Sequence, residues 1–279
     1  MIMDIGGQAL IEGVLVKTRD KIAISIRKKQ RIQTKTEKTS NISKKLSKIP
    51  FLRGIVILID TLILGTKALI YSAKEQEEDS KEKITNTSLT ITIAISFLIG
   101  IGLFIALPLF ISKLLTQNRI LFNLIDGLLR VAIFLAYLII ISTNSEIRRL
   151  FQYHGAEHMA IHCFESNQSL TIKNCKGFST IHPRCGTSFI FLVLIISIIL
   201  FSLVWAESFF IKLAQRILLI PVIASISYEI LKFSAKRQQN PIVKVISLPG
   251  LLIQKTTTKQ PDHQQLEVAI AAVKEATSP

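Results

Sequence analysis

The sequence predicts a mainly α-helical, polytopic membrane protein with about four transmembrane helices. An amphipathic membrane-associated helix and a small cytoplasmic part containing short N-terminal strands complete the predicted fold. Hydrophobic residues make up 49% of the chain, and the formal net charge is +15. Many apolar residues gather in four runs of about 20 residues, the length that crosses a bilayer as a helix. Lys and Arg lie mostly between those runs, as in the cytoplasmic loops of multi-pass proteins.

The four apolar runs are expected to be the transmembrane helices. They cover approximately residues 89–112, 120–142, 187–205 and 210–234. The second run contains Asp126 and Arg130, whose i, i+4 spacing places both side chains on one face of a helix. A paired acid and base are less costly near lipid than either charge alone. We therefore expect a structural ion pair there.

Residues 51–73 are apolar but carry three charges spaced seven residues apart, at Arg53, Asp60 and Lys67. This spacing places the three charges on one stripe of a helix. Such a stripe is typical of a helix that lies at the membrane surface or enters it only partly. A fifth complete span here would also move a basic segment to the outer side of the membrane.

The distribution of Lys and Arg predicts the orientation, with both termini in the cytoplasm of a multi-pass protein of the inner (plasma) membrane. On this topology the chain has six segments. They are a cytoplasmic N-terminal region with short strands and a basic loop (1–50), an amphipathic helix with a charged linker (51–87), transmembrane helices (88–142), a cytoplasmic loop with His and Cys motifs (143–186), transmembrane helices (187–234) and a cytoplasmic tail with a helix (235–279).

The two ends of the chain are expected to be soluble. Ile alternates with small residues over 22–26, which predicts a half-buried strand. The basic tract 27–48 is expected to be a solvated loop, with attraction to anionic lipid as the alternative. In the tail, Pro and Gly at 249–250 predict a turn. Asp262 is expected to cap a helix over residues 263–276.

The motif His154-x-x-Glu157-His158 has the inverted zinc-protease spacing. Residues four apart share a helix face, so two imidazoles on successive turns can hold one metal ion. Glu157 falls on the same side, where a carboxylate can take a proton from metal-bound water. His162 continues the row of histidines. The alternative is that these are surface or hydrogen-bonding histidines without a metal.

A second polar cluster, His182-Pro-Arg184-Cys185, follows within a short loop and favours the metal interpretation. Zinc prefers nitrogen, sulfur and oxygen ligands. We predict a divalent metal, with Zn²⁺ as the ion that suits this donor set. His154, His158, His182 and Cys185 are the expected ligands, with Glu229 or His162 as substitutes. Glu157 is the expected general base, and Arg184 is expected to stabilise negative charge on a substrate.

Several stretches together resemble a known family. They are the glycine-rich segment 6–14, Arg53-Gly54, the HGAEH motif at 154–158, the HPRCGTSF motif at 182–189, Tyr228-Glu229, Pro249-Gly250 and the segment 265–270. The chain resembles the YqhQ-like family of bacterial integral membrane proteins, which are described as predicted metal-dependent enzymes. The resemblance covers nearly the whole chain. It implies a metal-dependent enzyme in a membrane and names no substrate.

Three functions are compatible with these features. The first is a membrane-embedded hydrolase that acts on a peptide or a lipid-linked ester at the cytoplasmic face of the bilayer. The second is a non-catalytic scaffold or assembly factor with a structural metal site. The third is a transporter, for which the few charges near the bilayer give little support. Nucleic acid is not expected as a partner, because aromatic residues are few and are not interleaved with the basic ones.

Overall fold

The computed structural model describes residues 5–39, 49–76, 85–203, 208–237 and 239–278. The strands are β1 (Gly6–Leu10), β2 (Gly13–Lys17), β3 (Lys21–Lys28) and β4 (Arg31–Lys38). The helices are α2 (Leu52–Gln76), α3 (Asn86–Ile101), the π-helical turn η2 (Gly102–Ala106), α4 (Leu107–Leu115), α5 (Arg119–Ser142), α6 (Ser145–Glu165), α7 (Ile172–Cys175), α8 (Gly186–Leu203), α9 (Phe209–Lys236), α10 (Pro241–Thr257) and α11 (His263–Thr277).

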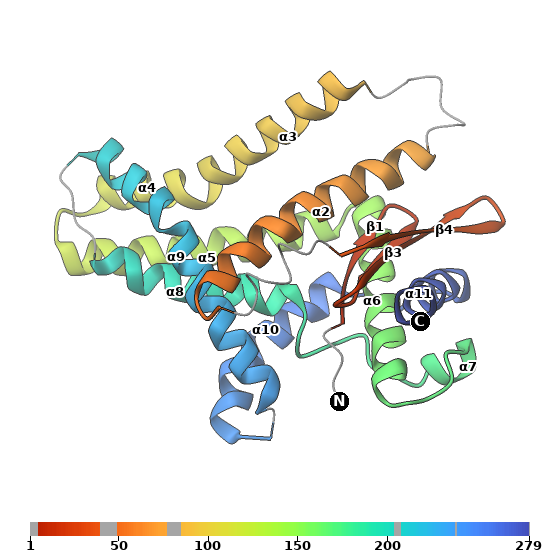
Figure 1. Ribbon diagram of the computed structural model, residues 1–279. Coiled ribbons are helices and arrows are strands. Elements are labelled where there is room, and N and C mark those ends of the chain that lie inside the picture. Colours follow the sequence, from red (N-terminus) through yellow and green to blue (C-terminus); the bar gives the residue numbers. More distant parts are fainter. Residues whose placement is uncertain (1–4, 40–48, 77–84, 204–207, 238, 279) are drawn as a thin grey trace.

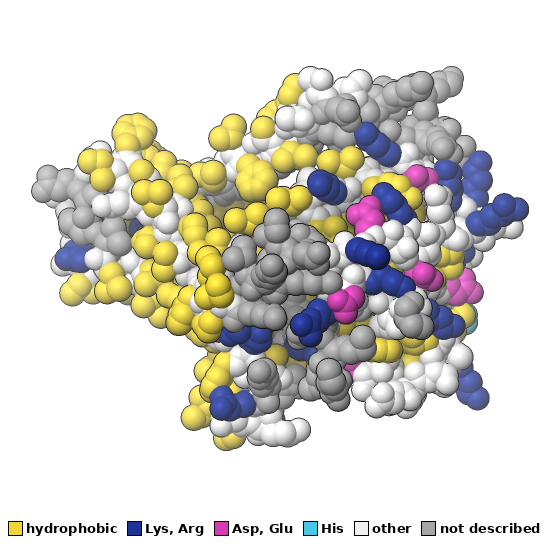
Figure 2. All heavy atoms as spheres, in the orientation of Figure 1, with side chains coloured by type: hydrophobic (Ala, Val, Ile, Leu, Met, Phe, Trp, Pro, Cys, Tyr) yellow, Lys and Arg dark blue, Asp and Glu magenta, His cyan; other side chains and the backbone are white. Residues whose placement is uncertain are grey.

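The described elements form two regions (Figure 1). The antiparallel sheet, in the order β1-β2-β3-β4, lies with α6, α7 and α11 on the right of the view. The long apolar helices α3, α5, α8 and α9 lie on the left. Figure 2 shows hydrophobic side chains over the left part, whereas most charged side chains gather on the right. The surface therefore changes character along the molecule, as expected for a protein with one part in a bilayer and one part in water.

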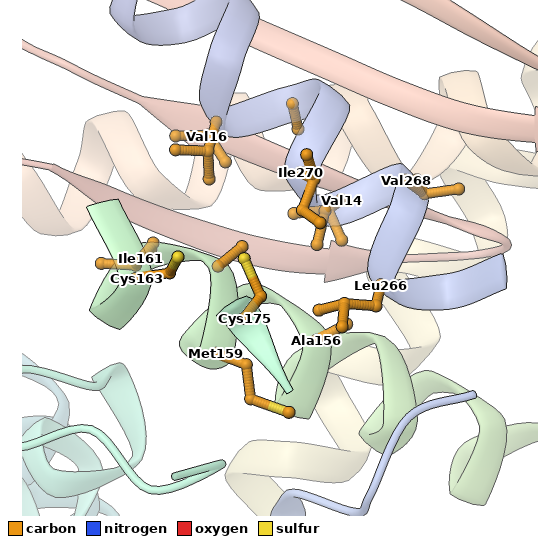
Figure 3. Close-up of a cluster of buried hydrophobic side chains, with 14 of the residues drawn as sticks. Val14, Val16, Ala156, Met159, Ile161, Cys163, Cys175, Leu266, Val268 and Ile270 are labelled. Atoms are coloured by element: carbon orange, nitrogen blue, oxygen red, sulfur yellow. The ribbon is translucent and has the colours of Figure 1, made fainter. Parts of the chain in front are cut away.

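The central strands β2 and β3 are buried on both faces of the sheet. Val14, Val16 and Ala23 point into a core shared with α6 and α11 (Figure 3). Leu15 and Ile24 point the other way, into a second core closed by α2. The strand expected over 22–26 is thus confirmed as part of β3, but it is covered on two faces instead of one.

The N-terminal basic tract is partly a strand, which corrects the expectation of a loop over 27–48. β4 pairs with β3, with Thr34 opposite Ser25, and their hydroxyls lie 2.8 Å apart. Most side chains of β4 are exposed. Its sequence therefore lacks the alternation of apolar and polar residues that predicts a half-buried strand. Residues 40–48 of the same tract lie outside the described residues.

Five described helices are long and apolar enough to cross a membrane, by length and composition. Four match the expected spans: Thr90–Leu115, Arg119–Ser142, Gly186–Leu203 and Phe209–Ala235. The fifth is α2, so the number of candidate spans differs by one from the predicted number of about four.

Helix α2 has two different environments along its length. Its N-terminal part packs closely on α9, where a Cβ at Gly54 would lie 2.6 Å from the Ser225 Cα. Its C-terminal part covers the sheet, and Ser72 Oγ accepts a hydrogen bond from the Ile11 N–H at 3.3 Å. The charged stripe is used in both places, because Arg53 pairs with Glu229 on α9 and Asp60 with Lys17 on β2.

The tail differs from the sequence expectation at one point and agrees at another. Pro249 and Gly250 lie inside α10 and form no turn. A Cβ at Gly250 would lie 2.9 Å from the Ser188 Cα, so this glycine allows α10 to approach α8. The predicted cap is confirmed: Asp262 and Gln265 form a capping box at the start of α11.

The expected pair of Asp126 and Arg130 is confirmed, and a third residue joins it. Arg130 donates to the Asp126 carboxylate at 2.9 Å, and Arg216 of α9 donates to its other oxygen at 2.7 Å. All three side chains are buried. One carboxylate therefore compensates two guanidinium groups between α5 and α9.

Replacing Asp126 by Asn should destabilise the helix bundle strongly, because two buried guanidinium groups would lose their counter-charge. We expect a loss on the order of 3 kcal/mol, visible as a lower unfolding temperature in detergent. Glu146→Gln, at an exposed position on α6, is the control and should leave the unfolding temperature unchanged. Equal stability of the two variants would contradict a structural role for this network.

Candidate metal centre

Helix α6 presents the histidine motif on one face and packs its other face into the core. The helix begins at an Asn144 cap, whose side chain accepts from the Glu146 N–H at 2.8 Å. Tyr153, Met159 and Cys163 are fully buried in the core with the sheet and α11, and Figure 3 labels the latter two. The apolar face fixes the rotation of α6, so the histidines point away from this core.

Three imidazoles follow one another along α6, and each is held by a backbone carbonyl from elsewhere in the chain. His154 Nδ1 lies 2.8 Å from the Thr257 oxygen, and His158 Nδ1 lies 2.6 Å from the Thr180 oxygen. His162 Nε2 lies 2.9 Å from the carbonyl oxygen of the residue after Thr180. A carbonyl only accepts, so the bonded nitrogen carries the proton and the other keeps its lone pair. This arrangement is typical of histidines that bind metals.

Cys185 completes a group of three donors with His154 and His158. Its Sγ lies 3.2 Å from His154 Nε2, and the three candidate ligand atoms lie within 4.8 Å of one another. Nitrogen and sulfur ligands of a tetrahedral zinc ion lie about 3.5 Å apart. The Thr187 N–H also donates to the Cys185 sulfur at 3.4 Å. Two imidazole nitrogens and a thiol at this spacing fit a zinc ion.

A second group of possible ligands lies beside the first. It contains His162, Glu165 and His182, again with their ligand atoms within 4.8 Å. The His158 and His182 rings are 5.6 Å apart between centroids. Glu165 also pairs with Arg184, and its Oε2 lies 3.3 Å from His182 Nε2. The structure therefore brings all four expected ligands into one region, with His182 in the neighbouring group.

The loop that carries His182 and Cys185 is fixed by α10. Gln254 is fully buried and forms two hydrogen bonds with the His182 backbone. Its side-chain oxygen accepts from the His182 N–H at 2.9 Å, and its amide nitrogen donates to the His182 carbonyl at 3.0 Å. Its amide nitrogen also donates to Ser188 Oγ at 3.0 Å. This clamp holds the loop against both α8 and α10.

Glu157 is buried beside the histidines, on the side that faces β1. It is 4% exposed, and its Oε2 has no hydrogen-bond partner among the described residues. A Cβ at Gly7 of β1 would lie 2.6 Å from Glu157 Oε1, so only a glycine leaves room for the carboxylate. Burial is the largest influence on Glu157 and raises its pKa, and the opposing electrostatic influence of the nearby imidazoles is smaller. This carboxyl group therefore holds a proton more readily than an exposed one.

Burial also keeps the neighbouring imidazoles neutral. It lowers the pKa of His158 and His182, and it lowers the pKa of His162 to about 4. Only a neutral imidazole has a lone pair for a metal, so His158 and His162 are in the form that binds one at neutral pH. The lone pair of His182 is used differently, because its Nδ1 accepts from the Arg184 N–H at 3.2 Å.

Some participants were not expected from the sequence. Glu165 lies outside the predicted ligand set, although its position eleven residues after His154 is about three helical turns along α6. The carbonyls that hold the rings have no sequence signal at all. The substitute ligand Glu229 lies outside both groups, where its carboxylate accepts from Arg53 Nε at 2.7 Å. Arg184, expected to face a substrate, pairs with Glu165 and lines a cleft.

Comparisons with known proteins give a family without a defined chemistry. Residues 49–278 match the family described as "Protein of unknown function (DUF1385)". The chain is 34% identical to "Uncharacterized protein YqhQ" of Bacillus subtilis (strain 168) over 295 residues. That alignment covers 97% of this chain and 91% of the relative. No solved structure matches the chain.

Gly155→Ala should disrupt the metal centre, because the added Cβ would lie 2.1 Å from the Lys259 carbonyl oxygen. The Lys259 carbonyl belongs to the backbone segment between α10 and α11, so this segment has to move. The movement would also displace the nearby Thr257 carbonyl, which holds His154. We expect a loss of about 1–3 kcal/mol in stability, measured by thermal unfolding. Gly186→Ala is the control, because no atom lies within 4 Å of a Cβ there. A Gly155 variant as stable as this control would contradict the close approach.

Proposed function

This chain belongs to the DUF1385 family, and we propose that it is a membrane-bound hydrolase that depends on a divalent metal ion. The donor set of His154, His158 and Cys185 suits Zn²⁺, with His182 from the neighbouring group as a further ligand. We place the site at the cytoplasmic face of the plasma membrane, with both termini in the cytoplasm. The excess of Lys and Arg in the N-terminal region supports this orientation.

The observation that supports the proposal most is the fixed orientation of the imidazoles. His154 and His158 each direct one ring nitrogen to a backbone carbonyl, which leaves the other nitrogen for an ion. A buried imidazole N–H needs an acceptor in any role, so the carbonyl contact supports a metal because of the second ring nitrogen, which for His154 lies 3.2 Å from the Cys185 sulfur. The same carbonyl contact also fixes the tautomer of a metal-binding ring and increases its affinity.

The residues around the proposed ion suit hydrolysis. A bound zinc ion supplies Lewis acidity and lowers the pKa of water. Glu157 is the proposed general base, and its buried Oε2, which lacks a partner among the described residues, supports this role. A general base of this kind contributes about 10²–10⁴-fold in rate. Arg184 carries positive charge at the edge of the site, where negative charge develops on a substrate carbonyl or phosphoryl group.

A structural metal in a non-catalytic scaffold is the second candidate. Cys185 favours it, because a thiolate ligand makes bound water a weaker nucleophile than an all-histidine or carboxylate set. In that case Glu157 would only orient a histidine. The two candidates share their ligands and differ in the role of this one carboxylate.

The purified protein should contain about one zinc ion per chain, and His158→Ala should release it. Elemental analysis of the detergent-solubilised protein measures this directly. Because His158 is buried, Cys185→Ser is a second variant that changes only one ligand atom, and it should also lose the ion. His263→Ala lies outside both groups and should retain it. Unchanged metal content in both ligand variants would refute the assignment.

Glu157→Gln should separate the hydrolase from the scaffold. The substitution keeps the shape of the side chain and removes its ability to accept a proton. We expect the variant to retain its metal and its unfolding temperature while hydrolysis of ester or peptide substrates falls by at least about 100-fold. Full activity in this variant would exclude Glu157 as the general base.

A further inference from the structure

A cleft of about 600 Å³ lies beside the candidate metal centre. β1 and β2 provide one side of it, and α2 and α9 provide another. Both of these helices are among the five of membrane-spanning length. The cleft is therefore formed where the soluble sheet meets helices that are built for a bilayer.

The lining of the cleft is strongly basic. Its charged members are Lys17, Arg19, Arg53, Arg184 and Lys232, and no Asp or Glu is among the described residues that line it. Apolar side chains, including Ile57 and Leu64 of α2, line the same space. A cleft with both characters suits a ligand that has an anionic end and an apolar end.

Three of the basic side chains are held in place by acids outside the lining. The pairs are Lys17 with Asp60, Arg53 with Glu229 and Arg184 with Glu165. The paired side chains are only 29%, 18% and 21% exposed for Lys17, Arg53 and Arg184. Partly desolvated and pre-oriented cations bind phosphate better than mobile surface ones.

The cleft comes close to the candidate catalytic carboxylate, although neither Glu157 nor any of the four proposed metal ligands is among the described residues that line it. Gly7 lines the cleft, and the absence of a side chain there leaves the Glu157 carboxylate directly behind it. Arg184 lines the cleft and contacts Glu165 of the second ligand group. A ligand bound in the cleft would thus lie next to the residues proposed to carry out hydrolysis.

We propose that this cleft binds the phosphate-bearing headgroup of an anionic membrane lipid. The cations hold the phosphate, and the apolar side chains of α2 contact the beginning of the acyl chains. Binding follows from the cleft alone. The further step, that the bound lipid is also the substrate, rests on the proposed hydrolase function. A lipid substrate would mean that the hydrolysed bond is a lipid-linked ester and not a peptide.

The test measures lipid binding to the full-length protein in detergent by native mass spectrometry. The probes are dihexanoyl phosphatidylglycerol, which is anionic, and dihexanoyl phosphatidylcholine, which is zwitterionic, with inorganic phosphate as a competitor. We expect tight binding of the anionic lipid and weak binding of the zwitterionic one. Equal binding of the two lipids overturns the proposal, and competition by phosphate at the same concentration as the anionic lipid would assign the cleft to a soluble phosphate instead.

Two variants locate the binding. The double variant Arg19→Gln/Lys232→Gln removes two cations of the cleft and should weaken binding of the anionic lipid about tenfold or more. Its matched control is Lys67→Gln/Lys255→Gln, which removes two exposed charges outside the cleft and should bind as the unaltered protein does. Thr61→Glu adds a negative charge inside the cleft without removing any pair, and should weaken binding too. Unchanged affinity in both cleft variants overturns the assignment.

Metal content is measured on the same samples, so that the two proposals fail separately. Unaltered protein that lacks metal but still prefers the anionic lipid would refute the hydrolase and retain the lipid site. Metal-loaded protein that does not distinguish the two lipids would refute the lipid site and retain the metal centre.

Discussion

The candidate site depends on the contact between the α6 histidines and backbone carbonyls from two distant parts of the chain. Thr180 belongs to the loop before α8, and Thr257 is the last residue of α10. Both segments have to be fixed relative to α6 before either imidazole can point its free nitrogen at Cys185. Gln254 provides part of this constraint, because it bonds the backbone of the loop from inside α10. The site is therefore a product of the whole helical arrangement, although its most conspicuous motif spans only five residues.

The position of α6 links the two regions of the molecule. Its apolar face is enclosed by the sheet and α11, and its histidine face meets the loop that begins α8. Helix α2 makes the same connection on the other side of the sheet, since one part packs on α9 and the other on β1 and β3. A site held between these elements lies at the boundary between the apolar helices and the soluble part. Such a boundary is where an enzyme can meet a substrate that is anchored in lipid.

Local sequence patterns predicted the features that depend on local spacing. The i, i+4 spacing predicted the Asp126–Arg130 pair and the histidine row, because neighbours on a helix are determined by the helix itself. The apolar runs predicted four spans because length alone decides them. What the patterns missed requires tertiary information. Arg216 joins Asp126 from 90 positions away. Gly250 lies inside α10 and allows the close approach of α8, although Pro-Gly usually indicates a turn.

The burial of Glu157 is the strongest argument that the cluster is more than a structural clamp. Its Oε2 has no hydrogen-bond partner in the part of the chain that the structure describes. A buried oxygen in that situation costs about 1–3 kcal/mol or more, and burial raises the pKa of this carboxyl group. Packing alone gives no reason to place a carboxylate there, since Ala156 and Ala160 on the same helix fill their positions without such a penalty. The chain nevertheless accommodates it, and the room is made by the missing side chain of Gly7. A destabilising acid that is given space beside imidazoles and a thiol supports the proposed role of Glu157 as a proton acceptor over a purely structural role.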